Sequence, residues 1–161
     1  MGWHPGALLV ALVCAPILAL PEDAEQPLLI NADSGTYNDD PNGTIEVSGN
    51  VQIQQGTLRV NAERMTATKR DGKLHRVVAT GGEDAPVRLR QRINPGEPVA
   101  RARARRIDYN IAEQQTQLTG DAFVSAGERE YTGGIIIWDM KENGIDCREG
   151  CQSRPRQAAP D

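Results

Sequence analysis

The sequence lacks the residue patterns on which most active sites depend. Its 161 residues include only two histidines, His4 near the start and His75 further along. It contains no Gly-x-Ser-x-Gly motif, no phosphate-binding glycine loop and no cluster of metal ligands. His75 lies in a Leu-His-Arg stretch typical of a strand surface, and carboxylates near turns, such as Asp39 and Glu128, are expected to be solvated. We therefore expect no enzymatic activity, no metal and no cofactor.

Aromatic residues and net charge are also scarce. The chain has one Phe, three Tyr and two Trp, and Trp3 lies in a segment that we expect to be removed. Val, Ile, Leu and Ala must then fill the interior, which suits a thin sheet-on-sheet sandwich better than a broad globular core. The length suits one domain. A formal charge of −4 is mild and argues against nucleic acid, which requires a strongly basic face.

The N-terminal segment is typical of an export signal. An apolar run of fourteen residues, 7–20, is interrupted only by Pro16. It is too short to span a bilayer comfortably and matches the central region of a secretory signal peptide. We expect residues 1–24 to be signal peptide and leader, cleaved after Ala19 or Ala24. The alternatives are an uncleaved N-terminal anchor and lipidation at Cys14, although Val13 stands where a lipidation signal has a small residue.

Two cysteines remain in the exported part, Cys147 and Cys151, and they flank the turn-like tripeptide Arg-Glu-Gly. In an exported protein such a close pair favours a small disulfide loop. Intermolecular pairing or free thiols are the alternatives, and the spacing is poor for zinc. The segment 152–161 has two prolines and no large apolar residue, so we expect a disordered C-terminal tail.

The stretch 45–53 alternates strictly between apolar or glycine positions and polar positions. This period of two predicts a strand with one buried face. The pattern returns at 118–127, where Gly120 and Asp121 stand in the places of Gly49 and Asn50. Dense turn formers, including Asp71-Gly72 and Asn143-Gly144, separate further alternating segments. No convincing amphipathic helix is present, and we predict an all-β fold.

The repeat extends over most of the chain. Four small residues act as anchors, and a glycine follows each of them after 16 to 19 residues. After each anchor the parity of the alternation shifts, which predicts a β-bulge or bend that re-aims the strand. Such self-similarity indicates stacked units that bury a core only together. The anchors are Ala32, Ala62, Ala104 and Gly133, and the glycines are Gly49, Gly81, Gly120 and Gly150.

The middle of the chain is rich in arginine. Three arginines alternate with alanines in the segment 100–105, and three more occupy alternate positions of the segment 88–92. Guanidinium groups suit bidentate recognition of phosphate, so Arg101, Arg103 and Arg105 are candidates for contacting it. The alternative is a solvated sheet face balanced by nearby glutamates. The alanine face leaves volume that the other sheet or a ligand must fill.

Two motifs carry a family resemblance. Residues 27–33 read Pro-Leu-x-Ile-x-Ala-Asp, and residues 47–65 read Val-Ser-Gly-Asn-Val-x-Ile-x-Gln-Gly-Thr-Leu-x-Val-x-Ala-Glu-x-Met. With the second copy at 104–109 and 118–122, they resemble the LptA/OstA family of periplasmic lipopolysaccharide-transport proteins. The resemblance runs from about Pro27 to Trp138. The cysteine pair and the arginine-rich middle depart from the family pattern.

The resemblance implies a fold and a function. The fold would be a slightly twisted, open β-jelly roll of many short antiparallel strands over residues 25–151. Lipopolysaccharide would pass from the inner to the outer membrane through a groove between the sheets, with partners in an inner-membrane component and an outer-membrane translocon of related fold. The alternatives are a structural β-scaffold of the cell envelope without lipid cargo and a module attached to a membrane component. The expected lipid-binding residues are Leu28, Ile30, Val51, Ile53, Leu89, Ile107 and Leu118.

The sheet edges predict assembly. Leu28 and Ile30 precede the first charged residue of the N-terminal strand, and the segment Ile135, Ile136 and Ile137 is equally apolar. We expect both segments to form unprotected edges, which template pairing with another chain. Two different adhesive edges on one molecule favour head-to-tail self-association.

Overall fold

The alternating segments form antiparallel strands in a computed structural model that describes residues 25–93, 95–139, 141–142 and 144–158. The described residues contain no helix that could cross a membrane. The predicted signal peptide, including Cys14, lies outside the described residues. The strands are β1 (Leu29–Asn31), β2 (Ser34–Thr36), β3 (Thr44–Gln55), β4 (Leu58–Arg70), β5 (Lys73–Thr80), β6 (Val87–Gln91), β7 (Ala100–Ala104), β8 (Arg106–Asn110), β9 (Gln115–Ala126), β10 (Arg129–Asp139), β11 (Gly144–Arg148) and β12 (Gln152–Pro155).

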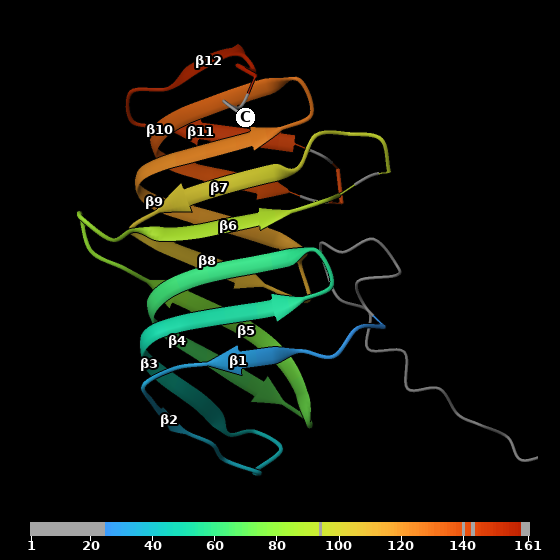
Figure 1. Ribbon diagram of the computed structural model, residues 1–161, viewed down its shortest axis with the longest axis vertical. Helices are drawn as coiled ribbons and strands as arrows, with labels where there is room; N and C mark the ends of the chain where they lie inside the picture. The colour runs from blue at the N-terminus through green and yellow to red at the C-terminus, as the bar shows by residue number, and fades with distance from the viewer. Residues whose placement is uncertain (1–24, 94, 140, 143, 159–161) are drawn as a thin grey trace, which may run out of the picture.

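The strands build two layers from one continuous sheet (Figure 1). The long strands β3, β4, β9 and β10 bend in the middle, so that each contributes one half to each layer. The first layer contains β1, β6, β7 and β12 together with one half of each long strand. The second layer contains β2, β5, β8 and β11 together with the other halves. This is the predicted all-β jelly-roll architecture.

The chain passes between the layers along one side of the molecule, in a row of corners. The Asp33 amide donates to the Gly49 carbonyl (2.8 Å), and the Arg105 amide donates to the Gly120 carbonyl (3.0 Å). The Gly134 amide donates to the Glu149 carbonyl over 2.8 Å. Each of the four anchors immediately precedes a corner, and the four following glycines lie at the intervening ones. The predicted bends after the anchors are therefore confirmed.

Glycine is required at two corners by conformation and by space. Gly49 has φ +79°, and a Cβ there would lie 2.5 Å from Asp33 Oδ2. Gly120 has φ +86°, and a Cβ there would collide with the Arg105 side chain. The following residues, Asn50 and Asp121, also have positive φ, which these short polar residues tolerate best after glycine. The repeated Gly-Asn/Asp pair in the sequence thus encodes the same turn of the backbone twice.

The inward positions of both layers form the core. The cluster around β7 and β9 includes Leu118, Val124 and Ile136, all 0% exposed, and a second cluster surrounds Val47 and Val51. Truncating such fully buried side chains typically costs about 2–5 kcal/mol. Aliphatic side chains therefore hold the two layers together, as the scarcity of aromatic residues predicted.

The C-terminal segment differs from its prediction as a disordered tail. Residues 152–155 form β12, which pairs with residues 129–132 of β10. Arg154 Nε lies 2.9 Å from Glu130 Oε2, and the Arg156 guanidinium donates to the Val99 carbonyl over 2.7 Å. An edge strand can be held by backbone and polar side-chain hydrogen bonds alone, so the absence of large apolar residues was not evidence of disorder.

Candidate functional site

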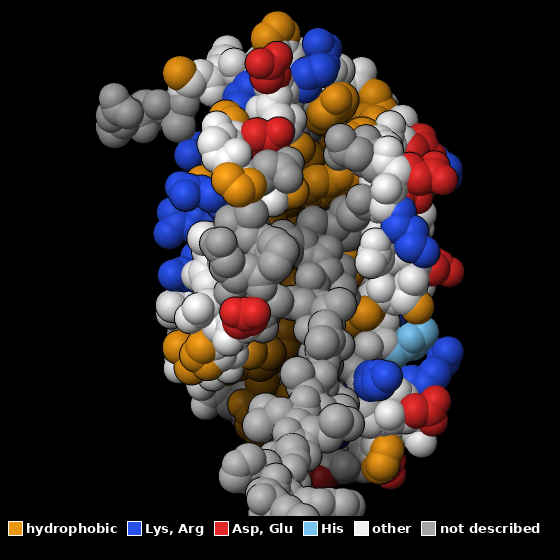
Figure 2. All heavy atoms as spheres, turned by 90° about the vertical axis from the view of Figure 1, so that its right-hand side faces the viewer, with side chains coloured by type: hydrophobic (Ala, Val, Ile, Leu, Met, Phe, Trp, Pro, Cys, Tyr) orange, Lys and Arg blue, Asp and Glu red, His pale blue; other side chains and the backbone are white. Residues whose placement is uncertain are grey.

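The two layers meet at the corners and separate toward their hairpin turns. Ala79, near a corner, is buried, whereas Val77, two residues closer to the hairpin on the same face of β5, is only partly buried. Figure 2 views the hairpin side, where hydrophobic side chains lie in a hollow between borders of polar and charged side chains. The space between the layers is thus filled at the corner side and incompletely covered at the hairpin side.

Apolar side chains from both layers line this interior. Val60 and Leu89 come from the first layer, and Ile93 comes from the segment that follows β6. Val77 and Ile145 come from the second layer. All five are partly buried hydrophobic residues packed against the core clusters. An apolar surface that is concave and still partly exposed favours a hydrocarbon ligand over a polar one.

The structure brings six of the seven predicted lipid-binding residues to this interior. Val51, Ile53, Ile107 and Leu118 are buried, while Ile30 and Leu89 pack against the clusters from their margins. Ile30 stands opposite Ile53 in the β1–β3 ladder. Leu28 differs, because it precedes β1 and remains 47% exposed.

The apolar interior also contains polar groups that were missed from the sequence. Tyr109 and Thr116 face each other across β8 and β9. Their hydroxyl oxygens are buried and have no hydrogen-bond partner among the described residues. Burial raises the pKa of Tyr109, so its hydroxyl stays protonated and can donate. The signal in the sequence was a polar or amphipathic residue at an inward position, two places from Ile107 and from Leu118.

The arginine-rich segments lie on the outside of the first layer. Arg88 stands opposite Arg103, and Arg90 stands opposite Arg101. Arg105 does not belong to this group, because it lies at a corner, where its guanidinium is 3.2 Å from Glu83 Oε1. The three arginines predicted to act together are therefore divided between a sheet face and a corner.

The C-terminal edge lies one strand further out than predicted. Residues 135–139 of β10 are hydrogen-bonded to β9 on one side and to β11 on the other. Ile136 points inward and is 0% exposed, so Ile135, Ile136 and Ile137 form no edge. The edge strands of the described chain are β1 and β2 at the N-terminal end and β11 and β12 at the C-terminal end. The apolar run was a core strand, which sequence alone does not distinguish from an apolar edge.

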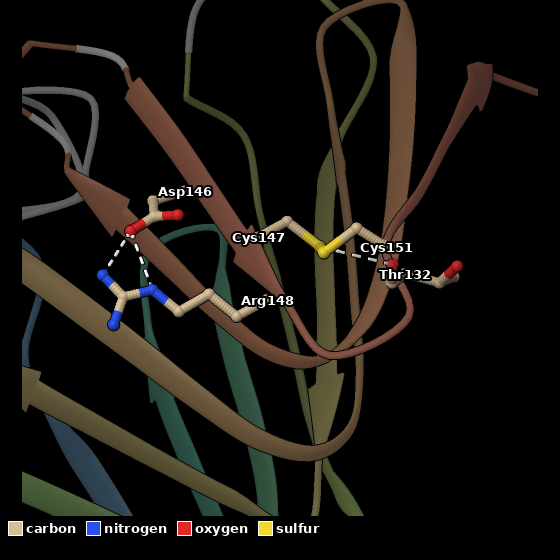
Figure 3. Close-up of a disulfide and its surroundings, with 5 residues drawn as sticks. All are labelled: Thr132, Asp146, Cys147, Arg148 and Cys151. Atoms are coloured by element: carbon tan, nitrogen blue, oxygen red, sulfur yellow. Dashed lines mark hydrogen bonds and ion pairs between the residues drawn. A yellow bond between two sulfur atoms is a disulfide. The ribbon is translucent and has the colours of Figure 1, made fainter.

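A disulfide closes the last corner (Figure 3). Cys147 in β11 is bonded to Cys151, with their Cα atoms 5.8 Å apart. The Cys147 Sγ atom also lies 3.4 Å from the Thr132 carbonyl oxygen of β10. The bond thus ties the last strand of the second layer to the start of β12 in the first. Among the described residues, no group of three or more His, Cys, Asp or Glu could hold a metal ion.

Comparisons with known proteins agree with this architecture. A family model described as "LptA/(LptD N-terminal domain) LPS transport protein" matches residues 29–144. The lipopolysaccharide export system protein LptA of Escherichia coli K12 is 29% identical over 136 residues, covering 84% of this chain and 71% of LptA. LptH of Pseudomonas aeruginosa, also described as a lipopolysaccharide export system protein, is 26% identical over 154 residues, covering 95% of this chain and 86% of LptH.

A solved structure extends the similarity to three dimensions. The crystal structure of LptH from Pseudomonas aeruginosa superposes with a TM-score of 0.67 at 25% identity, covering 81% of this chain and 87% of that one. It is described as the LptA homologous periplasmic component of the conserved lipopolysaccharide transport device. The two chains therefore share their overall fold.

Proposed function

Because this chain belongs to the LptA/(LptD N-terminal domain) family of lipopolysaccharide transport proteins, we propose that it binds lipopolysaccharide in the interior between its two layers. It would act in the periplasm and pass this lipid from the inner toward the outer membrane without catalysing a reaction. The observation that carries the proposal is the apolar interior that remains incompletely covered on the hairpin side.

The chemistry of the interior supports an acylated ligand. Hydrocarbon chains lying against Val60, Leu89 and Ile145 would remove apolar surface from water on both partners, at about 25 cal/mol per Å². The hydroxyls of Tyr109 and Thr116 have no protein partner among the described residues. They would bond to ester or hydroxyl oxygens of the acyl chains, which relieves the cost of burying them unpaired.

Site-specific photo-crosslinking in cells tests this function. A photo-reactive residue at Ile30 or at Leu89 is expected to capture lipopolysaccharide, because both side chains face the interior. The matched control is Gln117, which lies beside buried Leu118 but is exposed on the opposite face of β9. Equal capture at Gln117, or no capture at either interior position, would contradict the proposal.

Substitution gives a second test of the same site. Ile30→Asp places a charge in the interior and is expected to abolish binding of lipopolysaccharide, whereas Gln117→Asp should bind as the parent protein does. Circular dichroism and thermal unfolding check that both variants are folded. A folded Ile30→Asp protein with full lipid binding would exclude Ile30 from the binding surface.

The free edges would continue the interior from one copy to the next. Strand addition of β1 and β2 of one copy to β11 and β12 of another pairs exposed backbone groups and aligns successive interiors. The same mode would engage an inner-membrane component and an outer-membrane translocon of related fold. Because the two edges differ, the contact is head-to-tail and can propagate.

Crosslinking also tests this assembly. A photo-reactive residue at Thr36 of β2 is expected to give dimers whose crosslinked peptides contain residues 144–155 of a second copy, in amounts that rise with protein concentration. The control position is again Gln117, away from both edges. Sedimentation of the intact chain as a monomer at all concentrations would refute head-to-tail assembly.

A further inference from the structure

An unusual group of charges covers the outside of the first layer. Five arginines lie there on three adjacent strands: Arg59 from β4, Arg88 and Arg90 from β6, and Arg101 and Arg103 from β7. We call this surface the arginine face. Arg59, Arg90 and Arg101 are in one cross-strand row, and Arg88 and Arg103 are in the next. All but Arg59 are exposed.

No carboxylate in the described part of the chain forms an ion pair with the arginine face. Ser125 of β9 stands opposite Arg101, and Glu130 of β10 stands opposite Ser125. The Glu130 carboxylate is the next charged group along this row, and it is already paired with Arg154 at 2.9 Å. Like charges directly opposite each other in a sheet are destabilising. An arrangement that costs stability and lacks a carboxylate partner among the described residues points to an external anion.

The face is hollowed and partly ordered. A depression of about 470 Å³ lies among the five arginines, and its lining is completed by Asn61, Leu89, Ala102 and Phe123. The Arg103 guanidinium sits 5.7 Å from the centre of the Phe123 ring, close enough for a cation–π interaction that restricts its position. Arg59 is held by its own turn, because its guanidinium donates to the Leu58 carbonyl over 2.7 Å. Guanidinium groups fixed around a depression are suited to a compact ligand.

The geometry of the rows defines the ligand chemistry. Arg88 with Arg103, and Arg90 with Arg101, form two facing pairs that are two residues apart along the strands. That separation is about 7 Å. Each pair can hold one phosphate by bidentate hydrogen bonds. The Phe123 ring is already engaged by the Arg103 guanidinium, and the Asn61 amide suits a sugar hydroxyl.

We infer that the arginine face binds a sugar carrying two phosphate groups, one at each facing pair of arginines. The site is on the outside of the first layer and is separate from the apolar interior. It requires no acyl chain, so a soluble sugar bisphosphate and the bisphosphorylated head group of a glycolipid share the recognised chemistry. The inference does not depend on the proposed transport function.

Calorimetry with a soluble hexose 1,6-bisphosphate tests the inference directly on the purified chain. We expect the bisphosphate to bind roughly tenfold or more tightly than the corresponding monophosphate, because a second set of charge-assisted hydrogen bonds forms. Binding should weaken as salt is raised, since exposed charges are screened. Equal affinity for the monophosphate and the bisphosphate, or no binding of either, would overturn the two-phosphate assignment.

Paired variants assign the binding to the face. Arg88→Gln/Arg103→Gln and Arg90→Gln/Arg101→Gln each remove one facing pair, and each should reduce bisphosphate affinity to about that of the monophosphate. The matched control is Arg64→Gln/Arg70→Gln, which removes two exposed arginines of β4 that lie outside the face. All substitutions are at exposed positions, and thermal unfolding verifies the folds. An equal loss in the control would show a non-specific charge effect and refute the site.

Vesicles distinguish the two sources of phosphate. Neutral phosphatidylcholine vesicles containing a bisphosphorylated glycolipid should bind the parent protein and lose binding with Arg90→Gln/Arg101→Gln if the head group is recognised on a membrane. Soluble bisphosphate binding without vesicle binding assigns the free sugar. Strong binding to vesicles of an anionic phospholipid, together with no binding of the soluble bisphosphate, would overturn the inference in favour of a membrane-binding surface.

Discussion

The outer faces of both layers carry arginines, but the arginines differ in whether a carboxylate pairs with them. On the second layer, Arg76 and Arg106 both bond to Asp108, and Arg148 pairs with Asp146 at 2.6 Å. On the first layer, the arginine face has no carboxylate partner among the described residues. On the second layer an aspartate lies two residues from Arg106 and from Arg148 on the same strand, and Asp108 also reaches Arg76 of the neighbouring strand. In the arginine face, the cross-strand register places arginines directly opposite arginines. Arginine content alone therefore says little about binding.

The pairing on the second layer alters its titration. Hydrogen bonding from Arg76 lowers the pKa of Asp108 despite the partial burial of the carboxyl group, and Arg106 adds to the effect. The same contact raises the pKa of Arg76. A carboxylate that is held ionised by two guanidinium groups contributes stability that the arginine face cannot have.

Removing that carboxylate should have the largest effect. Asp108→Asn leaves Arg76 and Arg106 without their anion and makes the second layer resemble the first. We expect the free energy of unfolding to fall by about 1–2 kcal/mol, at the lower end for charged hydrogen bonds because both arginines are largely exposed. Urea unfolding at pH 7 measures the change. An unchanged midpoint would mean that the cluster is energetically neutral.

At low pH, the difference in unfolding free energy between the parent protein and Asp108→Asn should disappear. The pKa of Asp108 is lowered by folding, so its contribution is complete above its unfolded value of about 3.9 and is lost as pH falls through the lower folded value. The gap in unfolding free energy between the parent and Asp108→Asn should therefore be constant from pH 7 to 5 and close below about pH 4. A gap that persists at pH 2 would assign the effect to packing.

Adding a carboxylate to the first layer is the converse experiment. Asn61 stands opposite Arg88, so Asn61→Asp should create an ion pair there and compete with an external phosphate. We expect hexose bisphosphate affinity to fall about fivefold, equivalent to about 1 kcal/mol, with little change in stability. Asn61→Gln serves as the neutral control. Unchanged affinity in Asn61→Asp would place the phosphate away from Arg88.

The smallest effect is expected at the exposed pair of the second layer. Arg148 and Asp146 have side chains that are 60% and 53% exposed, and such surface pairs are weak because water screens them. Arg148→Gln should leave the urea midpoint at pH 7 unchanged within error. A clear shift would show that the charges near the disulfide support the C-terminal edge more than their exposure indicates.

The sequence predicted the architecture more closely than it predicted the sites. Alternation and the anchor–glycine repeat indicated the inward faces and the bends, since both follow from local backbone geometry. The positions of Arg105 and of β12 depended on pairing between distant segments. Alternation shows which residues share a face, but it does not show which strand is outermost or which carboxylate will lie opposite which arginine. Tyr109 and Thr116 escaped notice because their meaning depends on being neighbours across strands.

The row of corners connects the two layers along one side of the molecule, in the manner of a hinge. Within the described ranges, the passages between the layers are on that side, and on the other side the layers end in separate hairpins. A change in the angle between the layers would be concentrated at the corners, while the hydrogen-bond ladders within each layer stay intact. Bending at the corners would let the layers enclose ligands of different thickness, and the disulfide between Cys147 and Cys151 crosslinks the chain at the last corner.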